Sequence, residues 1–280
     1  MGLRGCFGLV ERELAAYLAV TRRLPYMKGA GAVANALKRV YTRRRRPEVE
    51  VDVLGMRMRL EPNEVVDRDL LFAPQLYDRP QLDLLRRRLH RGDVFLDVGA
   101  NVGVYALVAS PLVGPSGHVV AVEADPYNHA KLARHVTMND AKNVSVLHLG
   151  VADTEGTLMF APGIHGNRGG GSFVFSNEQN TPVRTKTLLG ILDDEGIVEA
   201  PAAMKMDIEL FEHRVMKRFF EDAPRARWPC FLLLERHDDP KFLELAGGDI
   251  IALCEANGYR VVWNLGGEYA LALGLTEENH

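Results

Sequence analysis

Short apolar segments of strand length alternate with longer amphipathic segments through most of this chain. Strands are predicted at residues 93–98, 118–123, 144–149, 203–208 and 230–235, and helices are predicted to begin near Asn101, Pro126, Thr187, Leu210 and Pro240. Alternation of this kind requires crossover connections, which produce an α/β fold with a mostly parallel sheet and helices on both faces. Ligands of such sheets bind at the carboxyl ends of the strands, so those positions are the first candidates for a site.

Antiparallel hairpins are predicted on both sides of this region. Apolar and polar residues alternate around Gly55 between residues 48 and 60, which predicts a β-hairpin with its turn at that glycine. A helix is predicted around Pro80–His90. Residues 259–273 predict two strands joined at Gly266-Gly267, which bring the sheet to seven strands with an antiparallel edge hairpin.

The first 46 residues differ in character from the rest of the chain. Residues 6–46 predict two helices separated near Pro25, and the second ends in KRVYTRRRR. Residues 1–46 hold 11 Lys and Arg against 2 Asp and Glu, whereas residues 47–280 hold 23 against 35. The sequence therefore predicts a basic helical extension at 1–46, a hairpin segment at 47–79 and a main domain at 80–280.

Composition excludes several classes of protein. The 280 residues are 47% hydrophobic and 25% charged, which is typical of globular proteins and excludes disordered and collagen-like chains. Cys6, Cys230 and Cys254 form no CxxC pair, so we expect neither a disulfide framework nor a zinc module. No apolar run approaches the roughly 18 residues of a membrane span, and no signal peptide is recognisable. These features favour a cytoplasmic location.

The first core strand ends in a glycine-rich turn. Residues 93–103, DVFLDVGANVG, place Asp97 at the strand end and Gly99, Asn101 and Gly103 before a helix. A dinucleotide such as NAD fits this spacing. A carboxylate at Asp97 repels a pyrophosphate but pairs with an ammonium group, and Glu123 at the end of the second strand is placed to accept two ribose hydroxyls. An ammonium group, a carboxylate and a ribose together describe S-adenosylmethionine better than NAD.

Four segments together resemble the FkbM family of class I S-adenosylmethionine-dependent methyltransferases. They are DVGANVGVY (97–105), VVAVEADP (119–126), KMDIELFE (205–212) and FLLLERH (231–237). The resemblance implies a Rossmann-like methyltransferase fold and favours O-methylation of a hydroxyl on a small molecule, sugar or secondary metabolite. Leu210 stands where the family has Gly, and it is expected to narrow the space beside the reacting centre.

The resemblance also implies which residues hold the cofactor. Adenine is expected between apolar groups near Ala124 and near Gly150-Val151, with Asp153 close to its amino group. The complete predicted cofactor set is Asp97, Gly99, Ala100, Asn101, Gly103, Tyr105, Glu123, Ala124, Gly150, Val151, Asp153 and Asp207.

Four ionisable residues at two adjacent strand ends form the predicted catalytic group. Methyl transfer needs the acceptor in line with the sulfur–methyl bond and its proton removed. Asp207 is expected to face the methyl end of the cofactor, Glu209 to orient the acceptor, and His237 to act as general base with Glu235 beside it. Capping of the next helix is the alternative role for His237. The same residues could bind a divalent cation, but the sequence favours a site without metal.

A polar, glycine-rich loop between Phe160 and Thr181 is the predicted lid of the site. His165, Asn167 and Ser172 are its candidate contacts to the substrate, and an exposed flexible connection is the alternative. The predicted partner is a small-molecule or glycan acceptor, and the sequence does not specify an oligomeric state.

The basic segment at residues 38–46 leaves other functions open. A structural cap or substrate lid ranks first, a peripheral contact with an anionic membrane second, and nucleic acid third, although Tyr41 could stack on a base. The alternative functions are N-methylation, RNA methylation guided by this segment, and a cofactor-binding scaffold without chemistry. Leu210 favours the scaffold. The residues that argue against it are intact Asp97, Glu123, Asp207 and Glu209.

Overall fold

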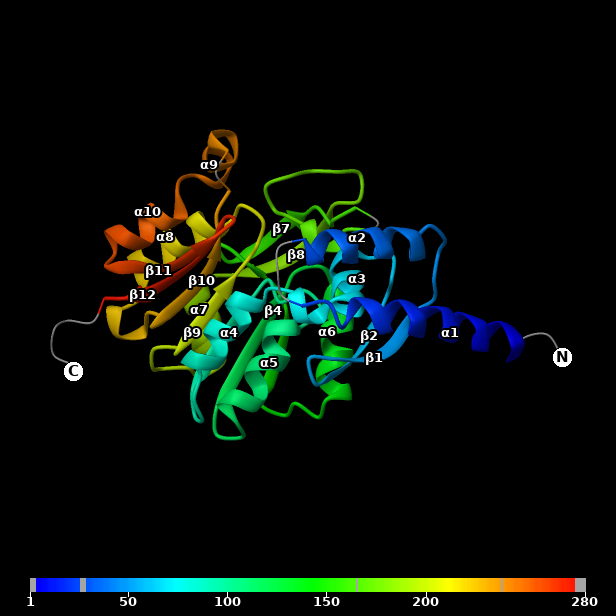
Figure 1. Cartoon of the computed structure of the whole chain (residues 1–280). Helices are drawn as coiled ribbons and strands as arrows, with labels where there is room; N and C mark the ends of the chain where they lie inside the picture. The colour runs from blue at the N-terminus through cyan, green and yellow to red at the C-terminus, as the bar shows by residue number, and fades with distance from the viewer. Residues whose placement is uncertain (1–3, 26–28, 165, 238, 275–280) are drawn as a thin grey trace. The chain divides into compact units, whose positions relative to one another are not determined.

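The computed structural model describes residues 4–25, 29–164, 166–237 and 239–274 (Figure 1). The chain forms two compact units: residues 1–79 with 165–167 make unit 1, and residues 80–164 with 168–280 make unit 2. Within the described ranges, no helix combines the length and the hydropathy needed to cross a membrane.

Unit 1 consists of helices packed beside a β-hairpin. Its elements are α1 (Arg4–Thr21), α2 (Ala30–Tyr41), β1 (Val49–Val53), β2 (Met56–Leu60), α3 (Val65–Phe72) and the 3-10 turn η1 (Pro74–Leu76). The rings of Tyr17, Tyr41 and Phe72 meet edge to face with centroids 5.2 to 6.4 Å apart, and they join the three helices. The hairpin turns at Leu54-Gly55, as the sequence predicts.

Unit 2 is built on a seven-stranded sheet with the order β11-β12-β10-β9-β3-β4-β5. The strands are β3 (Val94–Val98), β4 (His118–Glu123), β5 (Val144–His148), β9 (Ala203–Met206), β10 (Phe231–Glu235), β11 (Tyr259–Leu265) and β12 (Glu268–Leu273). Strands β10, β9, β3, β4 and β5 are parallel, and β12 runs antiparallel to both its neighbours. The predicted α/β fold with an antiparallel edge hairpin is confirmed.

The strand order reverses between β3 and β9, and this reversal positions the site. The helices of unit 2 are α4 (Arg79–Arg88), α5 (Val104–Val113), α6 (Pro126–Met138), α7 (Leu188–Asp194), α8 (Glu212–Asp222), α9 (Pro240–Ala246) and α10 (Ile250–Ala256), with a 3-10 turn η3 (Arg225–Arg227). Because crossovers are right-handed, α5 and α6 cover one face of the sheet and α8 covers the other. A crevice therefore opens at the carboxyl ends of β3 and β9.

A small second sheet in unit 2 was not expected from the sequence. It consists of β6 (Gly150–Val151), β7 (Gly156–Phe160) and β8 (Thr181–Lys186) in the order β6-β8-β7, and the 3-10 turn η2 (Arg168–Gly170) lies in the β7–β8 loop. The sequence also did not predict α3 and α10. These elements are short, and their apolar residues are too few to show a clear period.

Two predicted boundaries around the end of β9 differ from the structure by two residues each. Strand β9 ends at Met206 instead of residue 208, and α8 begins at Glu212 instead of near Leu210. Asp207 and Glu209 therefore lie on irregular backbone and not on a strand. Both Glu209 (φ 53°) and Leu210 (φ 74°) adopt left-handed conformations, which end the alternation of the strand.

Candidate functional site

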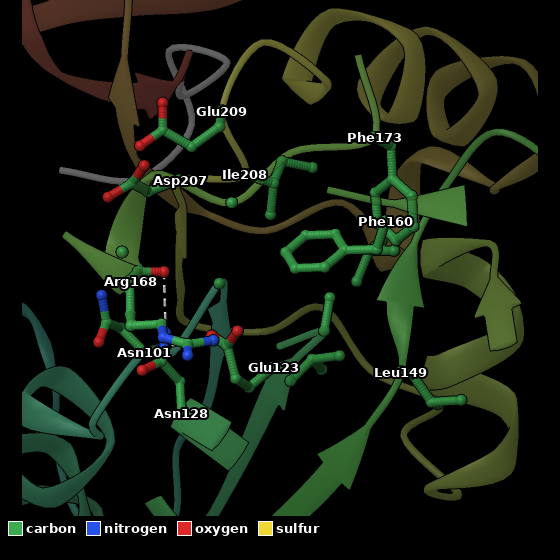
Figure 2. A pocket seen from close by; sticks show the side chains of 16 residues that line it. Asn101, Glu123, Asn128, Leu149, Phe160, Arg168, Phe173, Asp207, Ile208 and Glu209 are labelled. Carbon is green, nitrogen blue, oxygen red and sulfur yellow. Dashed lines mark hydrogen bonds between the residues drawn. The ribbon is translucent and has the colours of Figure 1, made fainter. Parts of the chain in front are cut away.

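A cavity of about 530 Å³ opens at the carboxyl ends of β3, β4 and β9. The cavity brings together seven of the predicted residues: Gly99, Asn101, Glu123, Ala124, Val151, Asp207 and Glu209. Figure 2 shows Asp207 and Glu209 close together at one end and the rings of Phe160 and Phe173 at the other. We call this space the main cavity.

Gly99 holds the turn after β3 against the end of β9. Its φ of 78° is left-handed, and a Cβ there would lie 1.9 Å from the backbone oxygen of Asp207. The N–H groups of Gly99 and Ala100 both donate to the carbonyl of Val122, at 3.0 and 2.9 Å. Only glycine fits this position, because any side chain would push the two strand ends apart.

Glu123 closes the floor of the main cavity at the end of β4. One carboxylate oxygen accepts from the N–H of Asn101 at 2.7 Å, and the other accepts from the N–H of Asp125 at 2.8 Å. Burial raises the pKa of Glu123 to about 7, although the two N–H donors oppose the shift. Each oxygen retains a free lone pair, so the residue can accept hydroxyl groups from a ligand.

Asp97 is a buried carboxylate, and one of its two oxygens lacks a hydrogen-bond donor among the described residues. Its side chain is 1% exposed, and one oxygen accepts from the N–H of Ala106 at 2.8 Å. The other oxygen has no hydrogen-bond partner among the described residues. Burial raises the pKa of Asp97 to about 6, and the charge of Lys205 acts against the increase. Asp97 is not among the residues that line the main cavity, although Gly99, two residues further along the chain, is.

Acidic side chains gather where β9 ends. Lys205 pairs with Asp207 at 3.0 Å and lies over the ring of Tyr105 at 5.0 Å. Burial and the charges of Asp207, Glu235 and Glu212 raise the pKa of Glu209 to about 8. Such raised values are typical of groups that exchange protons near neutral pH.

Glu212 belongs to this acidic group, although the sequence analysis did not select it. Its carboxylate accepts from the N–H of Ile208 at 2.7 Å, and burial raises its pKa to about 7. Glu212 is the last residue of the segment KMDIELFE, so its presence in that motif was a signal that could have identified it.

Glu235 and His237 lie at a second cavity of about 260 Å³ and do not line the main one. Leu210 lines the second cavity as well, so its side chain does not narrow the main cavity. The ring of His237 lies 5.4 Å from that of Phe242. The cap of α9 is Asp239, which accepts from the N–H of Lys241 at 2.9 Å. The capping role considered for His237 therefore belongs to Asp239.

The apolar wall of the main cavity comes largely from residues that the sequence analysis missed. Phe160 and Phe173 meet at 5.1 Å, edge to face, and Leu149 lies beside them. Arg168 also lines the cavity, with its guanidinium 5.1 Å from the ring of Tyr127. An aromatic pair flanking a glycine-rich loop was the available signal.

The other predicted cofactor residues support the cavity without lining it. A Cβ at Gly150 would lie 2.3 Å from the ring of Phe173, so this glycine makes room for the aromatic wall. A Cβ at Gly103 would lie 2.5 Å from Leu132, so that glycine allows α6 to pack closely. Ala100, Tyr105 and Asp153 also lie outside the lining.

The predicted substrate contacts that the structure describes fall in different units. Ser172 is buried in unit 2, where its hydroxyl donates to the carbonyl of Glu209 at 2.7 Å. Asn167 is exposed and belongs to unit 1. His165 lies outside the described residues. Across the described part of the chain, no three His, Cys, Asp or Glu side chains are arranged to hold a metal ion.

Comparisons with known proteins agree with this geometry. A family model described as the methyltransferase FkbM domain matches residues 97–261. An arsenite methyltransferase from Halobacterium salinarum is 39% identical over 67 residues, which cover 22% of this chain. The match spans 17% of the length of that protein.

Solved structures of low sequence identity are also similar. A methyltransferase FkbM from Methylobacillus flagellatus KT is 14% identical and has a TM-score of 0.41, with coverage of 71% of this chain and 59% of that chain. An S-adenosylmethionine-dependent methyltransferase from Aquifex aeolicus is 20% identical and has a TM-score of 0.38, with coverage of 69% and 86%.

Proposed function

The chain belongs to the FkbM methyltransferase domain family, and from that premise we propose that it transfers a methyl group from S-adenosylmethionine to a hydroxyl of a small molecule, sugar or secondary metabolite. The family match supports an S-adenosylmethionine-dependent methyltransferase. The choice of a hydroxyl acceptor is the finer part of the proposal.

The observation that carries this proposal is the composition of the main cavity. The main cavity is lined by glycine-rich backbone and by Glu123, whose carboxylate can accept ribose hydroxyls. The carboxylates of Asp207 and Glu209 line one end, and aromatic rings line the other. A pyrophosphate would face net negative charge here, whereas a cationic ligand is attracted. The arrangement therefore favours S-adenosylmethionine over NAD.

The residues present fit that cofactor. The unpartnered oxygen of Asp97 is a buried acceptor that suits an ammonium group next to the turn. Glu123 has lone pairs for ribose hydroxyls, and Phe160 and Phe173 provide an apolar surface for adenine. Bound there, S-adenosylmethionine supplies an activated methyl group on a positively charged sulfur.

Glu209 is the residue of the main cavity best suited to accept the acceptor's proton. Its raised pKa, about 8, makes it a strong base when ionised. Asp207 remains beside it, held by Lys205, so negative charge stays at the reacting end when Glu209 is protonated. His237 remains a second candidate for the base, acting from the second cavity.

Calorimetry tests the cofactor assignment. We expect S-adenosylhomocysteine to bind the purified chain and NAD to show no heat of binding. Asp97→Asn should weaken the binding of the cofactor at least tenfold, because the substitution removes the charge that pairs with the ammonium group. Binding of NAD without S-adenosylhomocysteine would overturn the assignment.

Single-turnover methylation with labelled S-adenosylmethionine tests the acceptor class and the base. Hydroxylated glycans and metabolites are screened first, and the best acceptor is then used with Glu209→Gln, His237→Gln and the control Glu221→Gln, an exposed residue of α8. We expect the methylation rate of Glu209→Gln to fall 10²-fold or more, on the order of a general base's contribution, and the rate of the control to be unchanged. A larger loss in His237→Gln would transfer the role to the histidine.

A further inference from the structure

The basic segment at residues 38–46 divides into engaged and unengaged cations. Lys38 is buried and pairs with Asp69 at 2.9 Å. Arg46 contacts both oxygens of Glu13 at 3.0 Å, and its guanidinium lies 4.3 Å from the centre of the Tyr41 ring. These two cations hold α1, α2 and α3 of unit 1 together, so they are unavailable to an external partner.

Four arginines of the same segment are exposed instead. They are Arg39, Arg43, Arg44 and Arg45. In the part of the chain that the structure describes, none of the four side chains forms an ion pair. The positive charge found in the sequence is therefore concentrated at the C-terminal end of α2 and in the residues that follow it.

The outward face of α2 is apolar and stands next to these arginines. The helix buries Ala34, Lys38 and Tyr41, which follow one another at helical spacing. Outside that buried stripe the helix exposes Val33 (48%) and Val40 (46%), one heptad apart. Ala32 and Ala36 are also exposed and share that side of the helix. An exposed aliphatic face bordered by exposed arginines is typical of helices that bind at a lipid–water interface.

We propose that the outward face of α2, with Arg39 and Arg43 to Arg45, docks on the surface of an anionic lipid bilayer. The arginines attract the acidic headgroups, and the valines enter the boundary between headgroups and acyl chains. The site would then work on an acceptor carried at or near a membrane. This proposal does not depend on the chemistry of the main cavity.

Two observations favour a bilayer over nucleic acid. A nucleic-acid surface offers little to exposed valines, because single-stranded binders use aromatic rings on which bases stack. Tyr41, the aromatic residue of the segment, is 1% exposed and packs against Tyr17 and Phe72. It is therefore unavailable for stacking, and the remaining pattern of arginine and aliphatic side chains suits lipid.

Vesicle sedimentation of the full chain tests the proposal. We expect binding to phosphatidylcholine vesicles that contain phosphatidylserine and much weaker binding to phosphatidylcholine alone. R43Q/R44Q/R45Q should weaken binding roughly a hundredfold, at about fivefold for each cation near an anionic surface. R43K/R44K/R45K should retain binding, because attraction to headgroups needs charge and not a guanidinium. The matched control R91Q/R184Q/R260Q removes three exposed arginines elsewhere and should bind as the wild type does.

The apolar part of the surface has its own test. V33N/V40N keeps every charge and should weaken vesicle binding at high salt, where headgroup attraction is screened. Thermal melts that match the wild type show that each variant is folded. The proposal is overturned if the full chain does not bind anionic vesicles, or if the control variant loses as much binding as R43Q/R44Q/R45Q. It is also overturned if the chain binds single-stranded RNA more tightly than vesicles and V33N/V40N changes neither RNA binding nor vesicle binding.

Discussion

Replacement of Gly99 by alanine tests the contact that positions the two halves of the site. The added Cβ would lie 1.9 Å from the backbone oxygen of Asp207, whereas carbon–oxygen contacts normally exceed about 3.3 Å. The turn after β3 and the residues after β9 must therefore separate by more than 1 Å, on the order of 3.3 minus 1.9. This movement would shift Asp207 and Ile208 out of the main cavity lining.

The magnitude follows from two separable terms. The left-handed φ of 78° costs an alanine about 1–2 kcal/mol, partly offset by about 0.4–1 kcal/mol from a less flexible unfolded chain. Overpacking adds about 1–3 kcal/mol. Gly196→Ala is the matched control, because Gly196 also has a left-handed φ, 66°, but a Cβ there meets no atom within 4 Å. We expect a loss of about 2–4 kcal/mol for Gly99→Ala and about 1 kcal/mol for the control.

Urea unfolding followed by tryptophan fluorescence measures both losses, since Trp228 is buried in unit 2. Calorimetry with S-adenosylhomocysteine then reports on the site, where we expect Gly99→Ala to weaken binding more than tenfold and Gly196→Ala to leave it unchanged. Equal losses of stability in the two variants, with equal affinity for the ligand, would refute the reasoning from the Gly99 contact.

Three further outcomes are expected. Because the pKa values of Asp97 and Glu209 are raised to about 6 and about 8, these carboxyls contribute stability below about pH 4 that is lost as the pH rises through 6 to 8. Over the same rise we expect S-adenosylmethionine to bind more tightly, with release of protons. Calorimetry in buffers of different ionisation heat detects that release, and an affinity independent of pH would contradict this prediction. Leu210→Gly removes a buried side chain worth about 2–3 kcal/mol and relieves about 1 kcal/mol of left-handed strain, so unfolding experiments should show a net loss of about 1–2 kcal/mol with cofactor affinity unchanged. Phe173→Ala should weaken the binding of S-adenosylhomocysteine by about 1–3 kcal/mol, the usual value of stacking on an aromatic ring. An unchanged titration would show that this residue does not contact adenine.

The sequence predicted the parallel core because most of its strands are buried on both faces. In β4, for example, five of the six residues from His118 to Glu123 are buried, so the strand appears as a continuous apolar run. Strands β7 and β8 are more exposed and polar, and their pairing depends on a chain reversal of about twenty residues that leaves no local pattern. The sequence analysis therefore did not predict β7 and β8.

The floor of the site was predictable and its walls were not. Asp97, Glu123 and Asp207 lie at the ends of apolar strands or directly after them, so their positions at one edge of the sheet follow from the alternation of elements. Phe173 and Arg168 lie in a loop without periodicity, and they reach the main cavity only through the small sheet. After Asp207 the chain contains two consecutive left-handed residues, Glu209 and Leu210, which side-chain patterns do not encode.

The pairing of β7 with β8 also fixes where the loop at residues 161–180 begins and ends. Phe160 and Thr181 are partners in the antiparallel register, so the chain leaves and re-enters the small sheet at neighbouring positions. Insertions, deletions or recombination within residues 161–180 can alter the wall of the main cavity while every strand of the large sheet keeps its neighbours. The wall of the main cavity can thus be changed in this chain without changing the pairing of the large sheet.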